Sequence, residues 1–329
     1  MSNNITVNNI EALNNALDIA LGTNENVVLY GQDAGFEGGV FRATKGLQAK
    51  YGVDRVWDAP IAEAAMVGSG VGAAIAGLIP IVEIQFSGFS FPGMMQFFAH
   101  AARYRARTRG VRNVPMVLRM PMGGGIRALE HHSETLEAVY SHIPGIKVVM
   151  PATPYDVKGL MLAAINDPDP VVFFEPKKIY RAFRQEIPAE AYTVKIGEAN
   201  IIQEGTDLTL VTYGPNVIEC WNLINEAEIA NICSVELIDL RTIKPWDRQT
   251  VINSVKKTGR LLVVHEAVKT FGVGAEIITT VNEKAFSSLK AAPKRVTGFD
   301  VTVPLAKGEH IQFNLDARIK DAIKEIMGR

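Results

Sequence analysis

Glu63 is a residue of this 329-residue chain whose type and setting could support acid–base chemistry. It stands in the segment DAPIAEAAMVGSGVG, at the start of an apolar run rich in small residues. Burial at such a position favours the protonated carboxyl, which could share a proton with a ligand nitrogen. The alternative is a partly exposed glutamate stabilised by the dipole of the helix that it begins. On the residues alone, this structural alternative is the commoner one.

Three histidines follow a glycine-rich stretch in GGGIRALEHHSETLEAVYSHIPG: His131, His132 and His142. A histidine beside a glycine loop could donate a proton or bind an anionic substrate. A metal site is disfavoured, because adjacent residues do not converge on one ion and no H-E-x-x-H spacing occurs. A surface or helix-capping histidine is the structural alternative, and spacing does not decide between the two.

Glycines and phenylalanines form two further candidate features. The glycine segment GQDAGFEGGVFRATKGL (31–47) matches neither G-x-G-x-x-G nor G-x-x-x-x-G-K-[ST]. It therefore indicates a loop with unusual backbone angles rather than a nucleotide phosphate site. The aromatic residues after Glu83 indicate core packing, with one ring lining a pocket as the alternative. They are Phe86, Phe89, Phe91, Phe97 and Phe98.

Short apolar runs alternate with helical patterns along the chain, and these elements must position the candidates. Strands are predicted over 27–30, 79–84, 115–120, 146–150, 171–175, 208–214, 235–240, 260–266 and 295–300. Helices are predicted at 10–21, 44–50, from 64, over 92–108 and 154–166, after Pro215, near 247–257, from 272 and near 315–327. The pattern predicts an α/β protein with two doubly wound domains, whose parallel sheets are covered on both faces.

The alternation stops at about 176–200, where the sequence is charged and contains Pro176 and Pro188. We interpret this segment as a linker or domain crossing. The chain is accordingly divided into a first domain over 1–185 and a second over 186–329.

Charge and hydropathy exclude several classes of protein. The 34 basic and 35 acidic residues leave a net charge of −1, so no basic surplus attracts nucleic acid or a membrane surface. The uncharged segment 64–82 has acidic flanks and an internal proline, which indicate a buried helix and strand, with Gly68, Gly72 and Gly77 allowing close backbone approach. The first 17 residues resemble neither a signal peptide nor a presequence, which favours a bacterial cytoplasm.

Six segments, collinear over nearly the whole chain, carry a family resemblance. They are GQDAGFEGGVFRATKGLQAKYG, RVWDAPIAEAAMVGSGVGAAIAGLIPIVEIQF, HHSETLEAVYSHIPGIKVVMPATPYDVKGL, DPDPVVFFEPKKIYR, LIDLRTIKPWD and GRLLVVHEAVKTFGVGAEI. Together they resemble the β subunits of the thiamine-diphosphate-dependent first component of 2-oxo acid dehydrogenase complexes. The resemblance implies a transketolase-like fold, in which a pyrimidine-binding domain precedes a transketolase C-terminal domain. The closest likeness is to the members that act on pyruvate.

The resemblance also implies roles for particular residues. Glu63 would hydrogen-bond the aminopyrimidine ring nitrogen of thiamine diphosphate, and Phe89 would pack on that ring, with Gln85 also at the cofactor. His132 would orient the 2-oxo acid and assist acyl transfer to a lipoyl group, with its neighbour His131 as second choice. Family members also bind a structural potassium ion, largely through backbone oxygens. The corresponding residues here are Met116, Ala164, Ile165, Asp167 and Asp169.

A complete thiamine diphosphate enzyme carries a G-D-G motif that helps to hold the magnesium diphosphate, and this chain has no G-D-G. The resemblance therefore implies an α subunit that supplies magnesium and the diphosphate half of each site, in a heterotetramer with a second β subunit. It also implies a dihydrolipoyl acetyltransferase partner. The alternatives are a branched-chain 2-oxo acid or acetoin dehydrogenase β subunit and, from another class, a non-catalytic scaffold subunit of the same fold.

Overall fold

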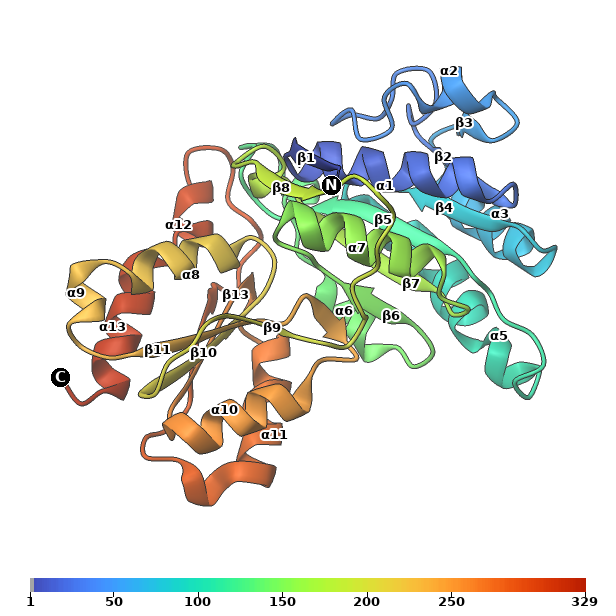
Figure 1. Cartoon of the computed structure of the whole chain (residues 1–329). Coiled ribbons are helices and arrows are strands. Elements are labelled where there is room, and N and C mark those ends of the chain that lie inside the picture. The colour runs from blue at the N-terminus through green and yellow to red at the C-terminus, as the bar shows by residue number, and fades with distance from the viewer. Residues whose placement is uncertain (1–2) are drawn as a thin grey trace. The chain divides into compact units, whose positions relative to one another are not determined.

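The computed structural model describes residues 3–329 (Figure 1). The N-terminal segment interpreted above begins with residues 1–2, which lie outside the described residues. The chain forms two compact units: unit 1 extends to Gly125 and includes His131–Ile196, and unit 2 comprises Ile126–Glu130 and Gly197–Arg329. None of the helices in residues 3–329 combines the length and the apolar character that crossing a membrane would need.

Unit 1 is built on a parallel sheet whose strands follow the predicted apolar runs. The strands are β2 (Val27–Gly31), β3 (Val56–Asp58), β4 (Ile79–Glu83), β5 (Val117–Met122), β6 (Lys147–Val149) and β7 (Val171–Pro176). They pair in the order β6-β7-β5-β4-β2-β3, and every pair in that series is parallel. Every residue of β2, β5 and β7 is buried, as expected for central strands with helices on both faces.

Helices cover both faces of this sheet. They are α1 (Asn9–Thr23), α2 (Leu47–Tyr51), α3 (Glu63–Ile75), α4 (Phe91–Gln96), α5 (Ala102–Arg107), α6 (Glu137–His142) and α7 (Pro154–Ile165), with short helical turns η1 (Ser87–Ser90), η2 (Phe97–Ala101), η3 (Glu130–His132) and η4 (Lys177–Ile179). Helices α1 and α7 pack side by side in the larger core (Figure 1). The Asn8 side chain and Glu11 cap α1 reciprocally, which satisfies backbone donors at its first turn.

The prediction of a buried helix after Glu63 is wrong for one side of α3. Its buried residues are Met66, Val67, Gly70, Val71 and Ala74, whereas Ala64, Ala65, Ser69 and Ile75 on the other side of the helix are exposed. The close approach expected at Gly68, Gly72 and Gly77 occurs instead at Gly70, where a Cβ atom would lie 2.9 Å from Cγ2 of Val82 in β4. The exposed side of α3 in this chain is thus a smooth, mostly apolar face made largely of small residues.

The segment interpreted as a linker or domain crossing contains regular secondary structure. It holds η4 and a strand, β8 (Gln185–Pro188), which pairs antiparallel with β1 (Asn4–Val7). Four-residue strands carry too little periodicity to be recognised in the sequence. Their pairing brings Asn4 against Glu186, which lies 182 positions later in the chain.

Unit 2 is a second, smaller doubly wound sheet. Its strands are β9 (Asn200–Gln203), β10 (Leu208–Thr212), β11 (Val235–Asp239), β13 (Leu261–Val268) and β14 (Lys294–Gly298). Unit 2 also contains the short strand β12 (Thr242–Lys244), which lies outside this sheet. Its helices are α8 (Asn216–Ile224), α9 (Ala227–Ala230), α10 (Arg248–Thr258), α11 (Val273–Ala285), α12 (Glu309–Phe313) and α13 (Asp316–Ile326), with the turn η5 (Phe286–Ser288). The sheet order is β14-β13-β10-β11-β9, and only the edge strand β9 runs antiparallel among these pairs. Helices α8 and α13 cover one face, and α10 and α11 cover the other (Figure 1). The predicted α/β class with two doubly wound sheets is confirmed.

Candidate functional site

The candidate site lies at the carboxyl ends of β2, β3 and β4 in unit 1. From β2 the chain moves outward to β3 and then returns to β4 on the opposite side of β2. Such a reversal of strand order opens the crevice in which doubly wound sheets bind ligands. Gln32 and Gln85 follow β2 and β4 closely, and Glu63 begins the helix after β3. The topology therefore brings three polar side chains to one edge of the sheet.

Glu63 is the first residue of α3 and is half-buried. Its Oε1 accepts a hydrogen bond of 3.2 Å from Nε2 of Gln32. The first turn of α4 packs closely on this end of α3, because a Cβ atom at Gly93 would lie 3.2 Å from the Glu63 carbonyl oxygen. The carboxyl group is thus fixed at the start of a helix while part of it stays accessible.

Gln85 ties the β2 and β4 ends together. Its Nε2 donates to the Gln32 carbonyl oxygen at 3.3 Å and to Oδ2 of Asp33 at 2.9 Å. Asp33 adopts a positive φ of 57°, one of several left-handed angles in the glycine segment, along with Gly38 and Gly39. The prediction that this segment is a loop with unusual backbone angles is confirmed, and the loop closes over the strand ends.

Phe89 and the two histidines come together on the same side of unit 1. The Phe89 ring centroid lies 5.0 Å from that of His132 and 6.0 Å from that of His131. His132 also contacts Phe86 edge-on at 4.5 Å. His132 is half-buried, whereas His131 is exposed. The burial difference favours His132 over His131 as the group that could act on a bound molecule.

A close backbone contact holds the histidine segment, which carries His131 and His132, in place. Gly88 sits against the carbonyl oxygen of His131, at a position where any Cβ would come within 2.3 Å of that oxygen. The hydroxyl of Ser87 donates to the carbonyl oxygen of Glu134 at 2.6 Å. The turn η1 therefore positions Phe89 and the histidine segment together, which sequence spacing of more than 40 residues did not indicate.

A buried ionic cluster supports the strand ends beneath this site. Arg119 on β5 is fully buried and donates to Glu175 on β7 at 2.6 and 2.8 Å, and also to Glu83 on β4. The Tyr180 hydroxyl donates to Glu175 at 2.5 Å. Burial raises the pKa of Glu83, although the Arg119 charge opposes the shift. Burial alone would lower the pKa of Arg119, but the charges of Glu175 and Glu83 outweigh it and the pKa rises.

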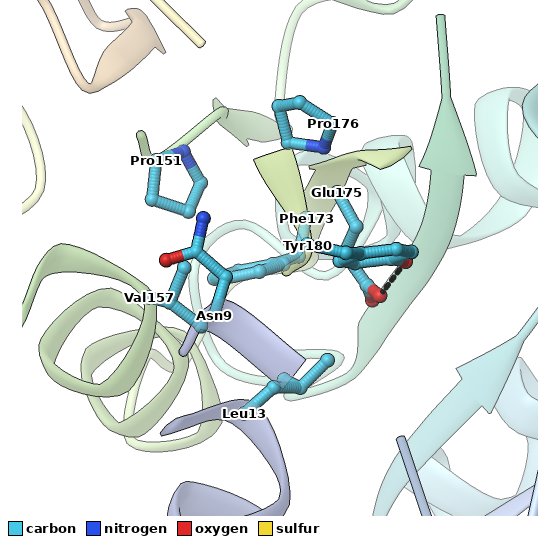
Figure 2. Close-up of a pocket in the computed structure, with 8 residues that line it drawn as sticks. All are labelled: Asn9, Leu13, Pro151, Val157, Phe173, Glu175, Pro176 and Tyr180. Atoms are coloured by element: carbon cyan, nitrogen blue, oxygen red, sulfur yellow. Dashed lines mark hydrogen bonds between the residues drawn. The ribbon is translucent and has the colours of Figure 1, made fainter. Parts of the chain in front are cut away.

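Neither Arg119 nor Glu175 stood out in the sequence as a functional or structural residue. The available signal was a charged side chain inside each of two otherwise apolar strands, PMVLRM and VVFFE. Buried charges at such positions require partners on neighbouring strands. A small pocket beside the cluster is lined by Asn9, Leu13, Pro151, Val157, Phe173, Glu175, Pro176 and Tyr180 (Figure 2). None of the candidate site residues lines it, so this pocket is separate from the site.

The residues predicted for potassium lie at the opposite edge of the sheet. Met116 precedes β5 and the other four precede β7, so all belong to the amino ends of the strands. The Asp167 carboxylate pairs with Lys147 at 2.6 Å, and Asp169 pairs with Arg105 at 2.7 Å. The carbonyl oxygens of Met116 and Ala164 accept backbone hydrogen bonds from Val171 and Asp167. A potassium ion here would therefore depend on backbone oxygens, and its binding stays a prediction.

Two family models match most of the chain. Residues 6–182 match the transketolase pyrimidine-binding domain, and residues 197–317 match the transketolase C-terminal domain. Among solved structures, the chain resembles one titled "Split gene transketolase, inactive beta4 tetramer", with a TM-score of 0.79. That likeness covers 98% of this chain and 99% of the other at 19% sequence identity, so it establishes the fold alone.

Curated relatives extend this assignment. The chain is 68% identical over 323 residues to "Pyruvate dehydrogenase E1 component subunit beta" of Mycoplasma genitalium, covering 98% of this chain and 99% of that protein. It is 45% identical over 302 residues to the Bacillus subtilis protein of the same name, covering 92% of this chain and 93% of the relative. The chain therefore belongs to the family of pyruvate dehydrogenase E1 component β subunits, within the transketolase-like proteins.

Proposed function

We propose that this chain supplies half of a thiamine diphosphate site, in an enzyme that oxidatively decarboxylates pyruvate and acetylates a lipoyl group. The proposal rests on the position of the Glu63 side chain. Gln32 holds its carboxyl group by a hydrogen bond, at the C-terminal ends of the strands of the unit 1 sheet. Family membership supports the cofactor, because transketolase-like E1 components use thiamine diphosphate. The names of the relatives support pyruvate as substrate.

The residues at the strand ends suit an aminopyrimidine. Glu63 offers an oxygen that can hydrogen-bond a ring nitrogen, and Phe89 offers an aromatic face within the same unit. When bound, thiamine diphosphate supplies the nucleophilic carbon that attacks the 2-oxo acid. Glu63 would hold a proton at the ring nitrogen, and Phe89 would keep water from that ring. His132, packed against Phe86 and Phe89, would orient the 2-oxo acid and assist acyl transfer.

A partner chain is needed for the other half of the site. The sequence contains no G-D-G motif for a magnesium diphosphate. Large apolar side chains near the strand ends are exposed, including Phe36 and Ile61 at 84% each and Met95 at 69%. Such side chains together with the smooth face of α3 are typical of a subunit interface. The proposed partners are an α subunit in a heterotetramer, a second β subunit and the acetyltransferase component.

We expect the purified chain alone to show no turnover of pyruvate, because it lacks the groups that hold the diphosphate and magnesium. Adding an α subunit that bears G-D-G should restore decarboxylation. The measurement is carbon dioxide release by the chain, by the α subunit and by their mixture, with thiamine diphosphate and magnesium in all three. Pyruvate turnover by this chain in isolation would contradict the shared site.

The substrate can be tested in the reconstituted complex. We expect lipoyl acylation with pyruvate to exceed that with 3-methyl-2-oxobutanoate by more than about tenfold in kcat/KM, because each extra methylene that a fitted apolar pocket must accept costs about 1–3 kcal/mol. Acetoin and 3-methyl-2-oxobutanoate test the two alternative dehydrogenases directly. A preference for either would replace pyruvate in the proposal. The bacterial relatives also lead us to propose a bacterial cytoplasm as the compartment.

A further inference from the structure

Gln32 contacts the Glu63 carboxyl directly and is itself nearly inaccessible to solvent. It is 5% exposed, and its Nε2 lies 3.2 Å from Oε1 of Glu63. The reversed amide would set the Gln32 carbonyl against a carboxylate oxygen, which is repulsive, so the N–H group must face Glu63. The contact therefore occupies Oε1 and leaves Oε2 for another hydrogen-bond partner.

The backbone of Gln32 is held as firmly as its side chain. Its carbonyl oxygen accepts from Gln85, which also binds the Asp33 carboxylate. Gln32 directly follows β2, a strand paired on both sides by β3 and β4. A side chain anchored in this way can hold the carboxyl group in one orientation with little loss of conformational entropy on ligand binding.

The chemical character of residue 32 matters as much as its position. An amide donates a hydrogen bond without carrying a charge and without taking up a proton in the physiological range. A carboxyl group at this position would compete with Glu63 for a proton, because two carboxylates this close cannot both ionise easily. The amide thus leaves Glu63 as the proton-carrying group at this point of the site.

We infer that Gln32 is a positioning residue, whose side-chain amide holds one oxygen of Glu63 so that the other meets the ring nitrogen of an aminopyrimidine. This inference rests on the proposed function, since it assumes that Glu63 binds that nitrogen. The measurable consequence is a difference in binding affinity. The complex should bind thiamine diphosphate more tightly than an analogue in which that ring nitrogen is replaced by C–H. The preference should depend on Gln32 through the orientation that its amide gives to the Glu63 carboxyl group.

The experiment compares the Kd values of thiamine diphosphate and of the C–H analogue in the complex reconstituted with the α subunit. The ratio of interest is the Kd of the analogue divided by the Kd of thiamine diphosphate. In Gln32→Met, which keeps the length of the side chain but removes the hydrogen-bond donor, this ratio should fall about tenfold. Gln32→Asn keeps the amide but is too short to reach Glu63, and should lower the ratio similarly. The matched control is Gln203→Met on β9 of unit 2, where the amide accepts from Asn225, and the ratio should not change.

The outcomes separate this inference from the function on which it rests. If Glu63→Gln leaves the ratio unchanged, the proposed role of Glu63 fails. If Glu63→Gln lowers the ratio but Gln32→Met and Gln32→Asn both retain the wild-type value, only the positioning role is overturned. Far-ultraviolet circular dichroism verifies folding, and if Gln32→Met does not fold, Gln32→Asn decides the result.

Discussion

The complex carrying Glu63→Gln should turn over pyruvate about two to four orders of magnitude more slowly than wild type, the range that positioned acid–base groups contribute. The amide keeps the shape of the side chain and its place at the first residue of α3, but it cannot hold an acidic proton at the ring nitrogen. The measurement is kcat for lipoyl acetylation at saturating thiamine diphosphate.

The control for this change is Glu37→Gln. Glu37 lies in the glycine segment of the same unit, but its side chain is 56% exposed and pairs with Arg42 at the surface. We expect its kcat to match wild type. Size-exclusion chromatography should show the same assembly for both variants. A wild-type rate in Glu63→Gln would favour the non-catalytic scaffold, because a subunit without chemistry does not need this carboxyl group.

Arg119→Met should lower the free energy of unfolding by roughly 3–5 kcal/mol, the cost of breaking a buried ion pair by removing one partner. The substitution leaves the Glu83 and Glu175 carboxyls, 2% exposed each, without the cation that both now contact. Tyr180 would still donate to Glu175, but a neutral hydroxyl does not compensate the charge. The measurement is chemical denaturation of the purified chain, followed by the loss of helical circular dichroism.

Two further variants make this stability test specific. Arg184→Met removes a surface pair with Glu11, in which both side chains are about half exposed, and an exposed hydrogen bond to the Thr6 carbonyl oxygen. It should change stability by only about 1 kcal/mol. Adding Glu83→Gln to Arg119→Met removes one of the stranded charges and should recover part of the loss. An Arg119→Met chain that unfolds at the same denaturant concentration as wild type would show that the cluster does not stabilise the strand ends.

The regular elements could be predicted from the sequence because their apolar residues repeat with clear periods. The runs at 27–30 and 171–175 and the helical spacing at 10–21 all became the expected elements. The short strands β1, β8 and β9 could not be found in this way, since pairing between distant segments stabilises them rather than local pattern. The exposed face of α3 was missed because small apolar residues look the same whether they face the core or a partner chain.

The candidate site could be predicted only in part. Glu63 and the histidine pair stood out by residue type, and family resemblance supplied their roles. Gln32 did not stand out, because a glutamine after an apolar strand resembles many surface residues until its contact with Glu63 is seen. The approach of Phe89 to His132 depends on Gly88 fitting against the His131 carbonyl, a tertiary contact that spacing along the chain does not encode.

The antiparallel pairing of β1 with β8 has a consequence for how the chain is made. Asn4 contacts Glu186, so strand β1 has to wait for a strand that is synthesised 182 residues later. At about 5–20 residues per second, that delay lasts roughly ten to forty seconds. During this interval the nascent N-terminal strand has an open edge that a chaperone could shield. Strand β1 can therefore be paired in unit 1 only after β8 has been translated.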